Sequence, residues 1–114
     1  MKYHNKKVVR DGEKYDSRKE YLRHCELKYL EKGGYISDLR RQVKYVLIPS
    51  QKENGKCIER ECSYYADFTY YKDGELIAED AKGMETKEFK IKKKLMLKRF
   101  GLIVKVVKVA TADI

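Results

Sequence analysis

Two carboxylates and a lysine lie in two neighbouring apolar segments, and their types suit metal-assisted chemistry on a phosphate ester. Asp67 lies within the first segment, and the triplet Asp80-Ala81-Lys82 ends the second. Magnesium takes oxygen ligands, keeps several waters and shares its shell with substrate phosphate, so one or two carboxylates can hold it. The lysine ammonium could then orient or help deprotonate the attacking water.

The local pattern predicts that these residues lie on two antiparallel strands. Ser63–Tyr71 is rich in aromatic residues, Lys72–Glu75 contains an Asp-Gly hairpin signal, and Leu76–Lys82 continues as a second strand. Side chains of a strand alternate between its two faces. One face would carry Leu76, Ala78, Asp80 and Lys82, and the other Ile77, Glu79 and Ala81. Asp80 and Lys82 are therefore expected to point the same way.

Each of these residues also has a structural interpretation. Asp67 lies among aromatic residues, where an unpaired carboxylate is costly, yet a solvent-facing strand end or a salt bridge to a lysine would also explain it. Glu79 precedes Asp80, and a register error of one residue would exchange their faces. The spacing to Lys82 favours Asp80 as the functional acid.

Composition limits the class of protein. The chain has 114 residues, 13.5 kDa and 42% hydrophobic content, which predicts one domain over residues 1–114. Lys and Arg number 27 against 18 acids, a net charge of +9. Such an imbalance favours a polyanionic partner, most often nucleic acid, although a generically basic protein is the alternative.

Cysteine usage and hydropathy point to the cytoplasm. Cys25, Cys57 and Cys62 are odd in number and show no metal-binding spacing, which favours reduced thiols. No apolar run approaches the length of a membrane span, and the N-terminus is polar and basic without a secretory apolar core. Neither secretion nor membrane insertion is expected.

The first half of the chain is predicted to form a basic arm, a helix and a strand. Residues 1–15 form the arm or a short hairpin that turns at Asp11-Gly12. A helix is predicted from Asp16-Ser17 to Gly33-Gly34, and a strand from Val43 to Pro49. Gln51–Lys56 is a polar loop with a hairpin signal at Asn54-Gly55.

The second half adds the two strands already described, a helix and a final strand. Thr86 is the expected N-cap of a helix that runs through Phe100 and ends at Gly101. Leu102–Val109 is a continuously apolar strand with interleaved lysines. The resulting order is helix, three antiparallel strands, helix, strand, which predicts an α/β fold.

This order, with an acid on the first helix, an aspartate ending the second core strand and an acid-x-lysine on the third, resembles the PD-(D/E)XK nuclease superfamily, also called restriction-endonuclease-like. The resemblance covers nearly the whole chain. Four stretches are similar to a group of small phage and prophage proteins of unassigned function in that superfamily. They are Tyr15–Glu20, Gly34–Leu39, Tyr65–Phe68 and Glu79–Gly83.

The resemblance implies an αβββαβ core, a mixed sheet flanked by helices, and Mg²⁺ or Mn²⁺ as cofactor. It implies that Asp67 and Asp80 hold the metal, that the backbone carbonyl of Ala81 adds a ligand, and that Lys82 positions the attacking water. One departure is that Ala66, not proline, precedes Asp67. The proline position is often relaxed in the superfamily.

Glu20 has two interpretations of equal weight. Ser17-Arg18-Lys19-Glu20 fits a capping box, in which Glu20 folds back on the Ser17 amide. The resemblance instead makes Glu20 the helix-borne catalytic and metal-binding acid, with Glu26 as the fallback. His24 lies one turn after Glu20 and is interpreted as a surface residue, outside the site.

The second helix is the expected phosphate-binding element. Its lysines far outnumber its single acid, Glu88, and like charges at i,i+4 such as Lys90 and Lys94 repel each other unless an anion lies alongside. Lys87, Lys90 and Lys94 are therefore predicted to contact DNA, with Lys87 and Lys90 closest to the scissile phosphate. The alternative is a solvated lysine face.

Together these features predict a metal-dependent endodeoxyribonuclease of phage or prophage origin. A structure-selective role, such as resolving a Holliday junction or other branched DNA, suits a chain with little length for groove-reading elements. A homodimer would place two sites on two strands. The alternative is a catalytically silent DNA-binding or phage assembly protein with the same fold.

Overall fold

The computed structural model describes residues 7–10, 12–81 and 84–108, which form two helices and eight strands. The helices are α1 (Arg18–Lys32) and α2 (Lys87–Phe100). The strands are β1 (Val8–Arg10), β2 (Glu13–Tyr15), β3 (Ser37–Ile48), β4 (Gln51–Glu53), β5 (Lys56–Glu59), β6 (Cys62–Lys72), β7 (Glu75–Ala81) and β8 (Val104–Val107).

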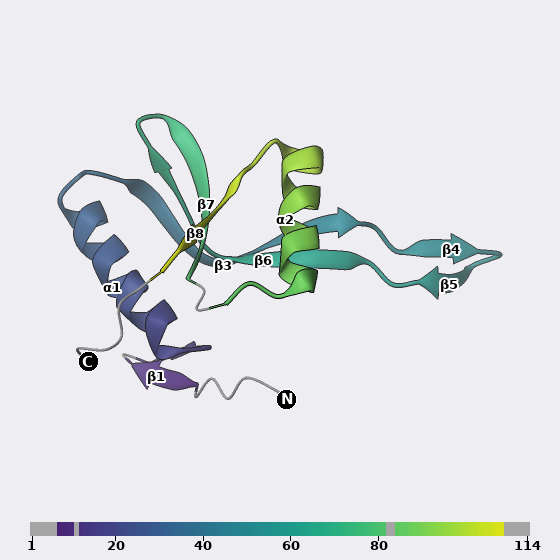
Figure 1. The fold of residues 1–114 in the computed structure, drawn as a ribbon, viewed down its shortest axis with the longest axis horizontal. Coiled ribbons are helices and arrows are strands. Elements are labelled where there is room, and N and C mark those ends of the chain that lie inside the picture. The colour runs from purple at the N-terminus through teal and green to yellow at the C-terminus, as the bar shows by residue number, and fades with distance from the viewer. Residues whose placement is uncertain (1–6, 11, 82–83, 109–114) are drawn as a thin grey trace.

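A four-stranded mixed sheet organises the fold, in the order β3-β6-β7-β8 (Figure 1). β6 pairs antiparallel with both β3 and β7, whereas β8 pairs parallel with β7 after the α2 crossover. The two helices stand apart along the long axis of the molecule. The predicted α/β class, with a mixed sheet flanked by helices, is confirmed.

Each helix covers its own hydrophobic cluster. The α2 cluster contains Leu47, Tyr64, Ala66, Ala78, Phe89, Met96 and Val104, and the α1 cluster contains Leu27, Ile36, Phe68 and Tyr70. β6 contributes to both, because Tyr64 and Ala66 pack in the first and Phe68 and Tyr70 in the second. The boundary between the two clusters therefore falls at Asp67.

The predicted helix caps and turns are confirmed. Ser17 and Thr86 are the N-caps, and each side chain accepts a hydrogen bond from the backbone N–H three residues later. Gly101 ends α2 with φ of +69°, which glycine adopts without strain. Asp73 and Gly74 both have positive φ, as the tight turn between β6 and β7 requires.

Three predicted strand boundaries were wrong. β3 begins at Ser37 rather than Val43, because its polar first half also pairs with β6. The strand ends at Ile48, before Pro49. The predicted polar loop instead forms β4 and β5 around the Asn54-Gly55 turn. β8 covers only Val104–Val107 of the expected final strand, whose last residue, Val109, lies outside the described residues.

The N-terminal hairpin was correctly predicted over its described residues. β1 and β2 pair antiparallel from Val8 opposite Tyr15 to Arg10 opposite Glu13. The turn residue Asp11 lies outside the described residues, as do residues 1–6 of the basic arm. Among the helices of the described residues, none is long and apolar enough to cross a membrane.

Candidate active site

Asp67 lies on β6 where the strand passes from one core cluster to the other. Its Oδ2 accepts a hydrogen bond of 3.0 Å from the backbone N–H of Ala81, at the end of β7. Its Oδ1 accepts one of 3.2 Å from the side-chain amide of Gln42 on β3. The carboxylate is thus held between the two strands that flank β6, and it lies beside the acid-x-lysine segment as predicted.

Glu20 has the contacts of a capping residue and also contacts Gln42, the partner of Asp67. Its backbone N–H donates to Ser17 Oγ at 3.2 Å, and its Oε1 accepts from the backbone N–H of Asp16 at 2.7 Å, one residue before the expected capping partner. Its Oε2 accepts from the Gln42 amide at 2.6 Å. One carboxylate therefore caps α1 and also reaches the site.

Glu20 and Asp67 are brought together by the shared Gln42 amide. The side chain of Glu20 is buried, and this burial is the main cause that raises the pKa of its carboxyl group. The negative charge of Asp67 raises the pKa further, whereas the hydrogen bonds from Asp16 and Gln42 lower it. The Asp67 carboxylate is therefore near enough for its charge to act on Glu20.

Asp80 lies on the opposite side of β7 from its neighbour Glu79. It is buried, and its Oδ2 accepts a hydrogen bond of 2.5 Å from the hydroxyl of Tyr64 on β6. Burial raises the pKa of Tyr64, and the charge of Asp80, this hydrogen bond and the charge of Asp67 raise it further. Tyr64 is therefore close to both aspartates, and it fixes the orientation of Asp80.

Glu79 instead binds Arg23 of α1. Its two carboxylate oxygens accept from Arg23 at 2.5 and 3.0 Å, and Oε2 also accepts from the Tyr70 hydroxyl at 2.5 Å. Burial and this hydrogen bond raise the pKa of Tyr70. A buried carboxylate with a bidentate guanidinium partner has a structural role. Glu79 is therefore assigned to the contact with α1, and Asp80 stays the predicted metal ligand.

Two residues of the candidate site, Arg41 and Gln42 of β3, were not predicted from the sequence. Arg41 Nη2 lies 3.3 Å from Glu20 Oε2, and its guanidinium stacks over the Tyr15 ring. Both residues belong to the part of β3 that was not predicted as strand. A run of polar residues after a helix carries no signal of this role.

His24 is a buried residue, contrary to the expectation of a surface position. Its Nδ1 lies 2.7 Å from the Tyr15 hydroxyl, and its ring stacks on Phe68 of β6. Burial lowers its pKa, and the charges of Lys28 and Arg41 lower it further. His24 therefore supports the packing of α1 rather than the acids of the site.

The lysines predicted to contact DNA lie on α2, whereas the lysine predicted to orient the attacking water follows β7. Lys87, Lys90 and Lys94 are exposed on α2. Their neighbours Lys92 and Lys93 form ion pairs with Glu88 at 3.0 Å and Glu85 at 2.8 Å. Lys82 of the acid-x-lysine triplet lies outside the described residues.

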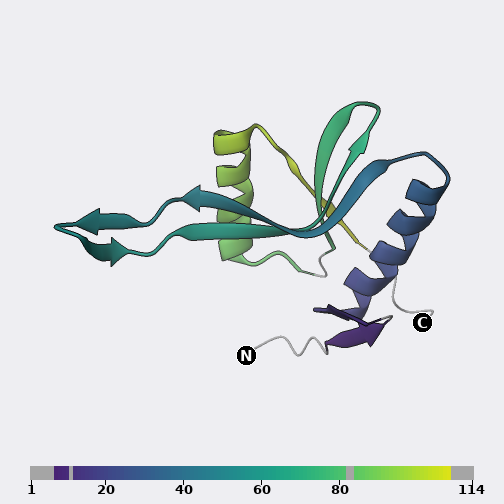
Figure 2. The same cartoon turned by 180° about the vertical axis from the view of Figure 1, so that it is seen from behind.

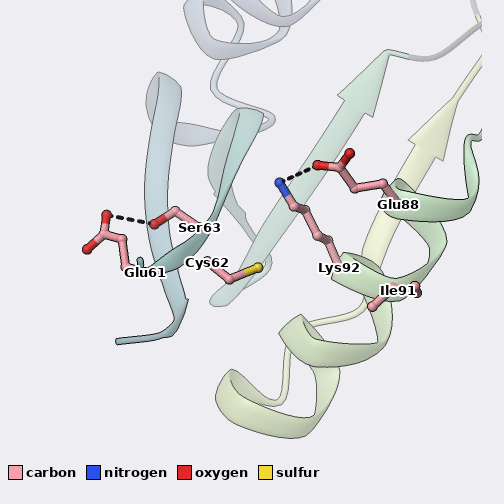
Figure 3. Close-up of a pocket in the computed structure, with 6 residues that line it drawn as sticks. All are labelled: Glu61, Cys62, Ser63, Glu88, Ile91 and Lys92. Atoms are coloured by element: carbon pink, nitrogen blue, oxygen red, sulfur yellow. Dashed lines mark hydrogen bonds and ion pairs between the residues drawn. The ribbon is translucent and has the colours of Figure 1, made fainter. Parts of the chain in front are cut away.

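A surface hollow lies elsewhere, between the start of β6 and α2 (Figure 3). It is lined by Glu61, Cys62, Ser63, Glu88, Ile91 and Lys92. Cys62 precedes Asp67 by five residues on β6, which corresponds to about 17 Å along a strand. The hollow is therefore separate from Asp67 and from the candidate active site.

Comparison with known families gives one match. The model of the family described as "Protein of unknown function (DUF1064)" matches residues 1–111. The chain belongs to the DUF1064 family. No curated protein and no solved structure matches it. Membership of DUF1064 assigns no activity, so a function must be inferred from the geometry of the site.

The acids of this DUF1064 chain fit a hard divalent cation by their chemistry. Glu20, Asp67 and Asp80 offer carboxylate oxygens from α1, β6 and β7, and Glu20 is influenced by the charge of Asp67. Within the described residues, no group of three or more His, Cys, Asp or Glu side chains lies close enough together to hold a metal ion. A cation here would take its remaining ligands from backbone, water or substrate phosphate.

Proposed function

We propose that this DUF1064 protein is a metal-dependent endodeoxyribonuclease, phage-encoded and selective for branched DNA such as a Holliday junction. One observation carries the proposal: the Gln42 amide joins Glu20 of α1 to Asp67 of β6, and Asp67 accepts the N–H of Ala81, next to Asp80. Glu20 and Asp67 thus lie beside the end of β7 that carries Asp80, an arrangement that supports the predicted nuclease chemistry.

The proposed roles follow from these contacts. Mg²⁺ or Mn²⁺, when bound, supplies an activated water and neutralises charge on the phosphate. Asp67 and Asp80 hold the cation, with Glu20 as the third acid. Gln42 and Tyr64 keep Asp67 and Asp80 oriented through their hydrogen bonds. Lys82 orients the attacking water, as the acid-x-lysine spacing predicts.

The basic surface supports DNA as the substrate. The net charge is +9, and Lys87, Lys90 and Lys94 are exposed on α2, which follows β7 in the chain. Lysine contacts to phosphates give affinity without reading sequence, which suits recognition of DNA shape.

The first experiment is cleavage of a labelled four-way junction, a matched duplex and a single strand in Mg²⁺ or Mn²⁺. Asp67→Asn and Asp80→Asn keep the shape of each side chain and remove its charge, so both should abolish cleavage while DNA binding remains. Glu75→Gln removes an exposed charge at the start of β7, away from Asp80, and serves as the control that should cut normally. Cleavage by the Asp80→Asn variant at the wild-type rate would contradict the proposal.

A second candidate is a catalytically silent DNA-binding or phage assembly protein. The exposed lysines of α2 favour it, because they could bind DNA without any contribution from the acids. Binding of all three DNAs without cleavage in either metal would support this alternative and contradict the nuclease.

A further inference from the structure

Two consecutive residues of β3 donate to the same oxygen atom. Arg41 Nη2 lies 3.3 Å from Glu20 Oε2, and Gln42 Nε2 lies 2.6 Å from that atom. Neighbouring side chains of a regular strand point to opposite faces of the sheet. A regular β3 could therefore bring only one of the two side chains to Glu20.

A local backbone distortion explains how both reach it. Gln42 has φ of +50°, in the left-handed region that residues other than glycine rarely adopt. Strand pairing continues on both sides, with Arg41 opposite Phe68 and Val43 opposite Ala66. Asp38, near the start of β3, also has positive φ, but between Arg41 and Val43 the left-handed conformation is limited to Gln42, and such strain is concentrated at functional sites.

The distortion places a neutral group between two acids. The Gln42 amide has two N–H donors, and it gives one to Glu20 at 2.6 Å and the other to Asp67 at 3.2 Å. A neutral amide orients both carboxylates without adding a positive charge that would compete with a cation. Arg41 does bring a positive charge to Glu20, at 3.3 Å, and its guanidinium is shared with Glu13 at 2.7 Å and with the Lys14 carbonyl at 2.9 Å.

We propose that Gln42 is a positioning residue that holds the Glu20 and Asp67 carboxylates side by side for a divalent cation, and that the strained backbone of β3 serves this purpose. This inference rests on the proposed metal-dependent function. It goes beyond that function, because neither the acid-x-lysine pattern nor the family assigns a role to this glutamine. The glutamine side chain would act through the acids and would not itself touch the metal.

The test measures Mn²⁺ affinity by isothermal titration calorimetry for the wild type, Gln42→Gly and Gln42→Asn. Glycine removes the amide and adopts the left-handed backbone freely, so Gln42→Gly should fold and bind Mn²⁺ about 10-fold to 100-fold more weakly. Asparagine tolerates the same backbone and retains an amide on a shorter side chain, so it should recover part of the affinity. Gln51→Gly changes an exposed glutamine of β4 and should bind like the wild type.

A double-mutant cycle separates positioning from general stability. If Gln42 acts by orienting Glu20 toward Asp67, Gln42→Gly should weaken Mn²⁺ binding much less in a Glu20→Gln background than in the wild type. Melting temperatures without metal show whether each variant is folded. A purely structural role predicts an equal loss of affinity in both backgrounds, and that result would overturn the inference.

The outcomes distinguish this inference from the function on which it rests. If the wild type binds Mn²⁺ and cuts DNA, but Gln42→Gly binds Mn²⁺ equally well, the positioning role is wrong and the nuclease proposal stands. If the wild type binds no Mn²⁺, both are wrong. Weaker binding by Gln42→Gly, partial recovery by Gln42→Asn and coupling to Glu20 support the positioning role.

Discussion

Adjacent acids of β7 show how the partner of a buried charge determines its role. Glu79 is buried against the guanidinium of Arg23, whereas Asp80 is held by the neutral hydroxyl of Tyr64. A guanidinium neutralises a carboxylate, so Glu79 is suited to holding α1 against the sheet. The phenol of Tyr64 orients the Asp80 carboxylate. The same residue class thus serves stability at one position and the candidate site at the next.

The structural role of Glu79 can be tested against a second partner of the same arginine. Glu79→Gln should lower the free energy of unfolding by about 1–3 kcal/mol, because a buried charge-assisted pair is removed. Glu26→Gln should have a much smaller effect, because Glu26 is 57% exposed and its pair with Arg23 is screened by water. Urea denaturation of both variants measures the difference, and equal effects would contradict the assignment.

His24 should make the fold sensitive to mild acid. Burial lowers its pKa below the ordinary value of 6.5, so the unfolded chain binds a proton that the folded chain resists. The contribution of His24 is present above pH 6.5 and is lost as the pH falls below that value. The free energy of unfolding should therefore decrease on acidification from about pH 7.5 to pH 5.

Two variants isolate this effect. His24→Phe retains a ring against Phe68 and should flatten the pH dependence in that range. His4→Gln changes the chain's other histidine and should leave the dependence as in the wild type. A decrease of equal size in His24→Phe would assign the pH dependence to other groups.

The sequence predicted the acids of the site but not the residue that joins them. Asp67 and Asp80 follow from strand pattern and spacing, and Glu20 was assigned both a capping and a site role, which its two oxygens divide between them. Gln42 has a left-handed backbone between two residues of β3 that pair with β6. Such a conformation at a non-glycine residue has no local sequence signal.

At the scale of elements, helix caps and tight turns were predictable, because one or two residue types determine their backbone geometry. Ser17 and Thr86 cap the helices, and Asp73-Gly74 and Asn54-Gly55 form the two tight turns that dipeptide signals predict. The start of β3 was not predictable, because its polar first half lacks the alternation of a half-buried strand. This half of β3 is a strand because it pairs with β6, and not because of its own residue preferences.

The lysines of α2 give a prediction for the helix as a whole. Replacing Lys87, Lys90 and Lys94 by glutamine should weaken DNA binding and reduce the slope of log affinity against log salt by about 0.9 for each phosphate that is no longer neutralised. Lys92 and Lys93 already pair with Glu88 and Glu85, so replacing them should change the slope less. Fluorescence anisotropy over a salt series measures both slopes, and equal changes would exclude a specific DNA-binding face.

At the scale of the whole molecule, the main departure from the predicted fold is an arm. Residues 49–61, which include β4 and β5, extend past α2 and away from α1 (Figure 2). All of them are exposed, and neither core cluster includes any of them. The arm is also balanced in charge, with Lys52, Lys56 and Arg60 against Glu53, Glu59 and Glu61.

Removing the arm should therefore change little about folding or phosphate binding. Ile48 and Cys62 are paired across β3 and β6, so an Asn-Gly turn can replace residues 49–61 and close the hairpin directly. The shortened chain should melt within a few degrees of the full chain, because no buried apolar side chain is removed. Its salt slope for duplex DNA should also be unchanged, because the deleted segment carries no net charge.

Cleavage by the shortened chain then shows what the arm contributes. Equal rates on duplex and four-way junction, in a chain that otherwise folds and binds normally, would assign structure selectivity to the arm. Retained preference for the junction would place that selectivity on the sheet and helices around Asp67. A large fall in melting temperature would contradict the independence of the core, since it would mean that residues 49–61 stabilise the sheet through contacts other than buried apolar packing.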